Sequence, residues 1–360
     1  MITSKRWAIT AGTLLIPTIA IKLFANHADW VENYYSNGIY RYISLTLRYT
    51  TGWLPVSFGD ILYLMIFIWI LLKITRSIQL LVKNELSFFI LKLQLQRLIL
   101  FILSIYIVFN LFWGLNYNRK GIGFQLGLAK ERYTKEELKT ITALLLKKVN
   151  ESKTVLISGN AEFNNYKDSI SLNQNPYIEI ARQFPFLTYD PVIVKPSLWA
   201  WAANYLGIYG YYNPFTGEAQ VNTKTLFFLQ PYTTSHEIAH QLGYAKEDEA
   251  NFVGYLAAST SSDPLLHYSV YLDLFNYSLH QLRLTDSVTA QLYATQLLPE
   301  VKKDILAWRQ FNYNHKNPVE PIISWIYGKY LENNQQPAGV LSYDEVTGLL
   351  IAYYKKFGRV

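Results

Sequence analysis

The chain has 360 residues, of which 51% are hydrophobic and 16% are aromatic, and its formal net charge is +7. It contains no cysteine, which excludes disulfides and thiolate metal sites. Its basic residues are spread along the chain, without a block of the kind that marks nucleic-acid-binding arms, so we expect no nucleic-acid partner.

Three long apolar stretches lie in the first third of the chain, at about residues 7–25, 56–74 and 98–115. Each is about long enough to cross a bilayer as a helix. A buried core helix is the alternative for each, but three such stretches crowded together and absent afterwards favour membrane insertion. We therefore expect the lipid bilayer as a partner.

The first apolar stretch follows two basic residues and lacks a small-residue cleavage site, so we interpret it as a retained signal anchor. The domain organisation that follows is a membrane anchor over residues 1–115 and a second domain over residues 116–360.

The connectors between the apolar stretches predict an orientation. The first is rich in Tyr and Trp, as expected at a membrane interface. The second, Ser77–Leu95, has apolar residues at helical spacing among Lys and Gln, which predicts a segment lying on the inner membrane surface. Basic residues are more numerous on the side of the N-terminus, which predicts that this side is cytoplasmic and that residues after the third span lie outside the cytoplasm. The two groups are Lys5, Arg6, Lys73, Arg76, Lys83, Lys92 and Arg97 against Arg41, Arg48, Arg119 and Lys120.

Residues 116–360 are predicted to be mostly helical with a small sheet. A capping box at Thr134–Glu137 opens a helix. Two short strands are expected within Tyr209–Asn222, around a strong turn pattern at Asn213–Gly217. No internal repeat and no nucleotide-binding glycine loop is present, and no feature of the sequence sets an oligomeric state.

One short motif carries chemistry. His236, Glu237 and His240 form an HExxH pattern. On a helix, the two histidines lie one turn apart on the same face and can bind one metal ion, while Glu237 lies beside the open coordination position. The alternative is a pair of solvent-facing histidines on an ordinary amphipathic helix. Pro231 at the predicted helix start and Gly243 at its predicted end argue for the metal site.

A two-histidine site needs a third protein ligand, and an acidic cluster follows at the start of the next predicted helix. Glu247 shares a helical face with Ala250 and Asn251, so Glu247 is favoured as the ligand and Asn251 as a hydrogen-bond partner of a ligand. Glu249 stays open as the alternative ligand, although it would point away from that face as a solvated charge.

At these residues the chain resembles known proteins. His236–Phe252 is similar to the gluzincin branch of HExxH zinc metallopeptidases, whose later helix carries a Glu followed by Ala and then Asn or Asp. Lys246 in place of a histidine, and the lack of a methionine after Met65, exclude the metzincin branch. More narrowly, the chain resembles a family of uncharacterised bacterial membrane proteins with a domain of unknown function, placed in that clan. That likeness extends to Gly210–Ala219 and, more weakly, to Trp113–Tyr117.

The resemblance implies a zincin-like α+β metallopeptidase domain behind three transmembrane helices, in a multi-pass protein of the bacterial inner membrane. It implies Zn²⁺ as cofactor, a peptide or protein substrate, Glu237 as general base, and an edge strand from the Tyr209–Asn222 hairpin beside the cleft; a plain structural hairpin is the alternative. A donor for the developing oxyanion is expected on a later helix, at His267, Tyr268 or Tyr271. The competing functions are a catalytically silent zinc-domain sensor or scaffold, and a hydrolase of a non-peptide amide.

Overall fold

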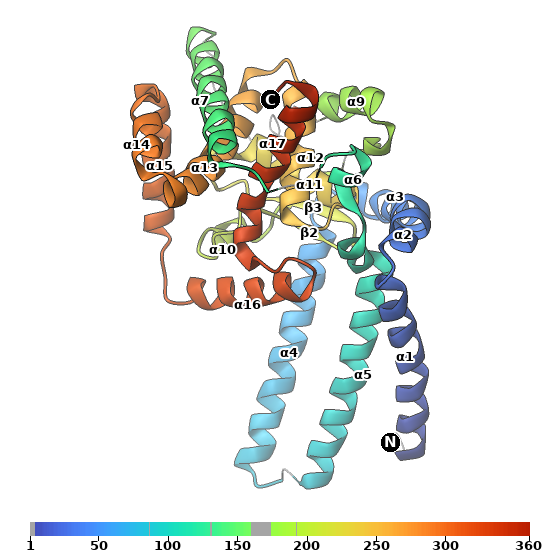
Figure 1. Ribbon diagram of the computed structural model, residues 1–360. Helices are drawn as coiled ribbons and strands as arrows, with labels where there is room; N and C mark the ends of the chain where they lie inside the picture. The colour runs from blue at the N-terminus through green and yellow to red at the C-terminus, as the bar shows by residue number, and fades with distance from the viewer. Residues whose placement is uncertain (1–3, 86, 130–131, 160–173, 192) are drawn as a thin grey trace.

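The structure, a computed structural model, describes residues 4–85, 87–129, 132–159, 174–191 and 193–360. Three long apolar helices project from one side of a mainly helical domain that contains a small sheet (Figure 1). The start of the first apolar helix and the turn between the other two lie at the end of the bundle that is remote from the domain. This arrangement places the domain at one end of the bundle and the turn at the other.

The three apolar helices are α1 (Ser4–Ala25), α4 (Phe58–Val82) and α5 (Phe88–Phe112). Their most apolar windows have mean hydropathies of 1.7, 1.9 and 2.0, and almost none of the side chains in those windows is buried by the protein. Apolar side chains that no protein covers need another apolar environment. All three helices are long and apolar enough to cross a membrane.

The helices α4 and α5 have other bounds than the apolar stretches at about residues 56–74 and 98–115. Most of the residues assigned to a surface-lying segment at Ser77–Leu95 instead complete α4 and α5, and only residues 83–87 separate the two helices. Ser87 ends this connection by accepting a hydrogen bond from the backbone of Ile90, as an N-cap does. Apolar residues at helical spacing are common to a surface helix and to the end of a span, so the pattern did not separate them. α5 ends at Phe112 and a 3-10 helix, η2 (Gly114–Asn118), follows.

The connector between α1 and α4 packs on the domain. It consists of α2 (Ala28–Trp30), the π-helix η1 (Val31–Ile39) and α3 (Tyr40–Gly52). Glu32 on η1 forms a buried ion pair with Arg119, with 2.9 Å between the Glu32 Oε1 and Arg119 Nη2 atoms. Aromatic side chains of the same connector, among them Tyr42 and Trp53, remain exposed. The connector therefore has one face on the domain and one face free of it.

The sheet has three short strands, β1 (Val194–Pro196), β2 (Gly210–Asn213) and β3 (Glu218–Val221), in the order β1-β3-β2. β1 is parallel to β3 and β2 is antiparallel to it. The predicted hairpin is confirmed: Asn213 accepts hydrogen bonds from the backbone of Phe215 and Thr216 at its turn. β2 is thus an edge strand of the described sheet.

A buried polar cluster, which we call the Glu218 cluster, joins the sheet to α4. Glu218 accepts hydrogen bonds from the Lys195 ammonium group, the Thr216 hydroxyl and the backbone N–H groups of Phe58 and Gly59. Those N–H groups belong to the first turn of α4, where an anion is favoured by the unpaired backbone donors. The sheet is therefore fixed to the domain end of α4.

Helices make up the rest of the domain. α7 packs along α13, and α11 packs against α12, around a core that includes Leu145, Phe252, Leu272 and Phe275. The capping box at Thr134 is confirmed at the start of α7. The remaining elements are α6 (Gly121–Gln125), α7 (Lys135–Ser158), α9 (Gln174–Gln183), η3 (Pro185–Leu187), α10 (Ala200–Asn204), η4 (Phe227–Leu229), α11 (Gln230–Gln241), α12 (Glu247–Thr260), α13 (Pro264–Thr285), α14 (Ser287–Thr295), α15 (Pro299–Asn314), α16 (Glu320–Asn333), η5 (Gly339–Glu345) and α17 (Val346–Phe357).

Candidate metal centre

The HExxH residues lie on α11, a helix buried along nearly its whole length. Pro231 occupies its first turn, where a proline costs no hydrogen bond. His236 and His240 are one turn apart on the same face, and their rings are perpendicular with centroids 4.6 Å apart. Both imidazoles are buried, so their nitrogen atoms need partners within the protein.

The end of α11 positions the second histidine. Gly243 has a φ of +87°, in the left-handed region that favours glycine, and the N–H of Tyr244 bonds back to the carbonyl of Ala239. This turn carries the Tyr244 carbonyl to His240, whose Nδ1 atom lies 2.7 Å from the carbonyl oxygen. The predicted helix end at Gly243 is confirmed, and it orients a site residue as well as ending the helix.

The last turn of α11 is held by residues that are close in sequence to the apolar helices. Trp113, directly after α5, donates its indole N–H to the carbonyl of His240 at 3.1 Å. Tyr40 and Ser44 on α3 donate to the carbonyl of Gln241 at 3.0 and 2.9 Å. Carbonyls in the last turn of a helix have no partner inside the helix, so these side chains satisfy them. These three side chains thereby fix the position of the two histidines.

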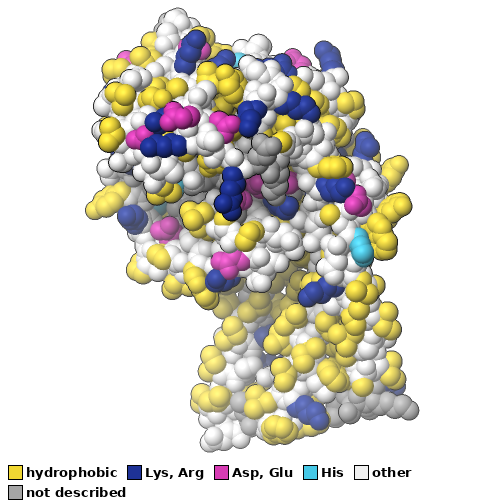
Figure 2. All heavy atoms as spheres, viewed as in Figure 1, with side chains coloured by type: hydrophobic (Ala, Val, Ile, Leu, Met, Phe, Trp, Pro, Cys, Tyr) yellow, Lys and Arg dark blue, Asp and Glu magenta, His cyan; other side chains and the backbone are white. Residues whose placement is uncertain are grey.

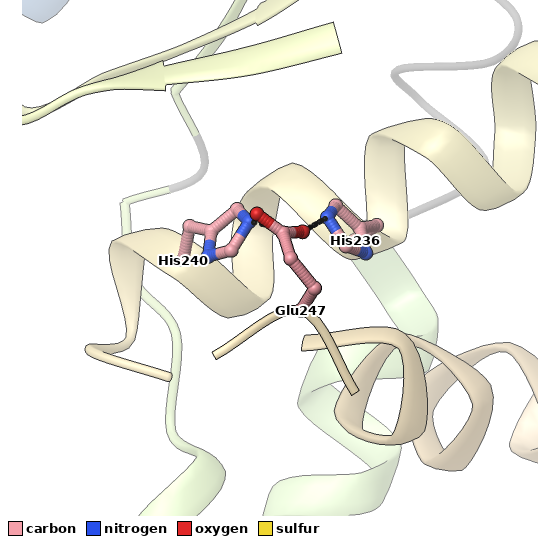
Figure 3. Close-up of side chains that lie close together, drawn as sticks. All are labelled: His236, His240 and Glu247. Carbon is pink, nitrogen blue, oxygen red and sulfur yellow. Dashed lines mark ion pairs between the residues drawn. The ribbon is translucent and has the colours of Figure 1, made fainter. Parts of the chain in front are cut away.

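α12 brings a carboxylate to the imidazoles (Figure 3). The Oε2 atom of Glu247 lies 3.2 Å from the Nε2 atom of His236 and 3.5 Å from that of His240. The three residues each offer one ligand atom, and these atoms lie within 4.8 Å of one another. The residue favoured from its helical face, Glu247, is the acid that meets both histidines.

The other ring nitrogen of each histidine is already engaged. The Nδ1 atom of His236 lies 2.8 Å from the side-chain oxygen of Asn251, the contact expected from the sequence, and that of His240 faces the Tyr244 carbonyl. Both partners are acceptors, so each Nδ1 carries the proton in the neutral ring and each Nε2 presents a lone pair. Metal-binding histidines are usually oriented in this way.

Glu249 lies elsewhere. Its carboxylate packs against the backbone of Gly121 at the start of α6, so closely that a Cβ atom at position 121 would overlap it. It is buried and 3.7 Å from the Lys246 ammonium group, which makes the expectation of a solvated charge wrong. The sequence showed that Glu249 faces away from Glu247, but only packing places α6 over it.

Glu237 lies on the buried side of α11 beside the edge strand. A Cβ atom built on Gly210 at the start of β2 would come within 2.6 Å of the Glu237 Oε1 atom, so only a glycine allows this approach. The Oε2 atom has no hydrogen-bond partner among the described residues. Burial raises the pKa of Glu237 to about 8, with the Glu247 charge acting in the same direction against His240. In the metal-free protein Glu237 is therefore mostly protonated near neutral pH, and a cation held by the histidines would lower its pKa and free it to accept a proton.

The charges of His236, His240 and Glu247, which we call the triad, are coupled. Burial lowers the pKa of His236. Burial also opposes protonation of His240, but the facing Glu247 carboxylate outweighs it and raises the pKa of His240 to about 9. At Glu247 burial favours the neutral acid, and the imidazoles outweigh it and hold the pKa of Glu247 well below its usual range. Without a metal, the carboxylate is therefore balanced by a proton on His240.

The donor set fits zinc. Two imidazole Nε2 lone pairs and one carboxylate oxygen converge from two helices, and zinc in catalytic sites has three such ligands with one position left for water. Magnesium and calcium prefer all-oxygen sites, which this is not. A dication would replace the proton held between Glu247 and His240.

The residues expected to stabilise an oxyanion have their described contacts away from the triad. The buried Tyr268 donates its hydroxyl proton to Asp304 on α15. His267 and Tyr271 line a separate cavity of about 570 Å³ together with Lys148 of α7. Their place on α13 was argued by analogy with a later helix, and sequence spacing does not fix which side of α13 meets the site.

Tyr327 on α16 contacts the triad instead. Its hydroxyl donates to the Oε1 atom of Glu247 at 2.6 Å, and the backbone N–H of Glu247 donates to the Gln336 side chain. The sequence offered no means of finding this residue among 29 tyrosines, 80 positions from its partner. Tyr327 has the chemistry of a donor that holds one carboxylate oxygen while the other faces the imidazoles.

Comparison with known proteins gives the family but no activity. Residues 35–351 match the family described as "Protein of unknown function (DUF3810)", and the chain belongs to it. No curated protein and no solved structure matches the chain.

Proposed function

We propose that the protein is a membrane-anchored, zinc-dependent metallopeptidase of the gluzincin type, with a zincin-like domain held by three transmembrane helices. The observation that carries the proposal is the convergence of His236, His240 and Glu247 beside Glu237, a carboxyl group with an unpaired oxygen. A structural zinc site has no need of such a base and closes its fourth position with a protein ligand.

When bound, zinc supplies a Lewis acid that polarises the substrate carbonyl and lowers the pKa of water. Glu237 accepts a proton from the attacking water as the oxygen bonds to the carbonyl carbon. The same proton then passes from Glu237 to the leaving nitrogen as the C–N bond breaks. His236, His240 and Glu247 keep their geometry through these steps because Asn251, the Tyr244 carbonyl and Tyr327 hold them from behind.

The neighbouring strand supports a peptide substrate over another amide. β2 is an edge strand and starts at Gly210, against Glu237. An extended peptide that pairs with an exposed strand edge gains backbone hydrogen bonds, and pairing along β2 would bring its backbone to the base. A small amide without a peptide backbone would gain nothing from the strand.

The basic residues of the sequence support an orientation with the domain outside the cytoplasm, in the inner membrane of a bacterium. Lys5 and Arg6, and the basic residues near the α4–α5 turn such as Lys83, belong to the ends of the apolar helices that are remote from the domain. Such ends face the cytoplasm when the positive residues are retained there.

The test uses the full-length protein in detergent micelles or vesicles with a quenched fluorescent peptide library. We expect hydrolysis that a chelator removes and that added Zn²⁺ restores. Glu237→Gln should keep the metal and lower the rate about 10²- to 10⁴-fold, because it removes the base and leaves the ligands. Equal rates for the wild type and Glu237→Gln on every peptide, with zinc bound in both, would favour a zinc-binding scaffold.

A further inference from the structure

Helix α16 presents an apolar face that nothing in the described protein covers. Ile322, Trp325 and Ile326 follow one another at helical spacing, and Trp325 is 65% exposed. Val319, just before the helix, extends the same face and is also exposed. Lys329 follows on the same face one turn later, where a long basic side chain extends to charged or aqueous surroundings. The face is too apolar to be explained as an ordinary water-exposed helix surface.

A second exposed apolar group lies at α10. Leu198 and Trp199 precede this short helix and Trp201 is within it, with 71% of its surface exposed. The ring of Tyr205, directly after α10, lies 5.0 Å from that of His315, and Asn317 donates to the Tyr205 carbonyl. The segment around α10 is therefore next to the residues that lead into α16.

Both elements are attached to the domain ends of the apolar helices. The backbone N–H of Leu198 donates to Asp60, in the first turn of α4, at 2.7 Å. The ring of Tyr330 on α16 lies 6.4 Å from that of Phe109, in the last turn of α5. Figure 1 shows α16 crossing the direction of α4 and α5 at the level where these helices meet the domain. In Figure 2, yellow side chains lie along the lower border of the domain, just above the apolar helices.

We propose that α16 and the α10 segment insert into the surface of the lipid bilayer that the three helices span, as a second membrane contact of the domain. The bilayer is the occupant because both faces are continuous with the domain ends of two candidate spans, where the boundary between lipid and water must lie. Trp and Tyr side chains with a nearby Lys are typical of that boundary. A helix lying in the plane of the membrane buries its apolar face at this depth.

This contact deepens the proposed function, on which the following consequence rests. Tyr327 lies on the other side of α16 from the membrane-inserted face, and its hydroxyl contacts Glu247. The proposed zinc centre is therefore tied to a helix at the bilayer surface. Its substrates are peptide segments held at the membrane surface, such as the lipid-attached or membrane-spanning ends of other proteins.

The test of the membrane contact does not depend on activity. Because the chain has no cysteine, a single cysteine at one position can carry an environment-sensitive fluorophore. In full-length protein reconstituted into phospholipid vesicles, a label at Trp325→Cys should be quenched by lipids that carry a nitroxide near the headgroup. The same label should be shielded from a water-soluble quencher.

Val288→Cys on α14 is the matched control, since Val288 is apolar and 79% exposed but lies on a part of the domain remote from the apolar helices (Figure 1). Its label should be quenched from water only. If the label at position 325 behaves like the one at position 288, the membrane contact is refuted. If it is shielded from both quenchers, a second copy of the chain covers the face and the proposal is equally refuted.

A second arm separates this proposal from the peptidase. Ile326→Glu should lower the rate of hydrolysis of a lipid-attached peptide in vesicles by at least about tenfold, because a charge at the bilayer surface opposes insertion of the helix. The rate on the same peptide without its lipid, in solution, should be unchanged. An equal effect on both peptides would refute the route from the membrane. Absence of hydrolysis in the wild type would refute the peptidase and leave the labelling result standing.

Discussion

Two buried carboxylates of this protein have opposite surroundings. Glu218 is surrounded by donors that always carry a proton: the Lys195 ammonium group, the Thr216 hydroxyl and two backbone N–H groups. Glu247 has one such donor, the Tyr327 hydroxyl, on one oxygen, and two imidazole nitrogens on the other. An imidazole nitrogen is a donor only when it is protonated.

The difference separates a structural cluster from a candidate reactive one. The charge of Glu218 is balanced by the Lys195 ammonium group, so its cluster needs no further ion and fixes α4 to the sheet. The charge of Glu247 is balanced only by a mobile proton or by a cation, because both Nδ1 atoms are already used. A buried acid that faces imidazole lone pairs is a place where a metal ion can take over the role of that proton.

The largest expected effect is a loss of folding stability when the Glu218 cluster is broken. Lys195→Met leaves Glu218 buried without its counter-charge, which typically costs about 3–5 kcal/mol. Chemical unfolding of the full-length protein in micelles should show this loss, with metal binding retained in the protein that stays folded. Lys329→Met is the control, since its pair with Glu332 is exposed and should change stability by less than about 1 kcal/mol. Equal losses in the two variants would contradict the assignment.

Removing a ligand from the group formed by His236, His240 and Glu247 should lower the affinity for zinc instead. Glu247→Gln should lower zinc affinity more than about 100-fold, beyond the change caused by loss of an outer partner. His240→Ala should behave in the same way. Glu249→Gln should bind zinc normally, because its carboxylate lies against Gly121. Metal analysis after dialysis measures this, and full occupancy in His240→Ala would refute the ligand set.

A smaller change is expected from the partner behind the first histidine. Asn251→Ala removes the acceptor that orients His236 and should lower zinc affinity about 10- to 100-fold. Competition with a fluorescent chelator gives the constant. Asn251→Asp keeps an acceptor oxygen at the same position, so its zinc affinity should be close to that of the wild type. If Asn251→Asp loses as much affinity as Asn251→Ala, the acceptor oxygen does not orient His236.

With rising pH, the stability of the metal-free protein and its affinity for zinc should change in opposite directions. The pKa values of Glu237 and His240 are raised to about 8 and about 9, so their contribution to stability is lost as pH rises through these values. Metal-free protein should therefore lose thermal stability between about pH 6.5 and 9. Zinc competes with the His240 proton, so its affinity should rise about tenfold per pH unit over that range. A flat affinity profile would contradict the shared proton.

Much of the candidate site was readable from local spacing. The two histidines, the helix end at Gly243, the face of Glu247 and the contact of Asn251 follow from helical periodicity within sixteen residues, His236 to Asn251. The contacts of Tyr327, Tyr40 and Trp113 do not, since each joins residues 80 or more positions apart. The expectation of a donor on α13 relied on analogy. In the structure Tyr268 contacts Asp304 on α15, and Tyr271 contacts Lys148 on α7.

The sequence by itself determined three apolar helices, a mainly helical remainder with one hairpin, and a helix with two histidines on one face, because hydrophobicity and helical period are local properties. Tertiary structure alone decided that the connector at residues 28–52 packs against the end of α11, that Glu249 is buried, and that α16 reaches both Glu247 and the last turn of α5. These depend on which surfaces meet when the chain closes on itself, and no spacing within a segment encodes that choice.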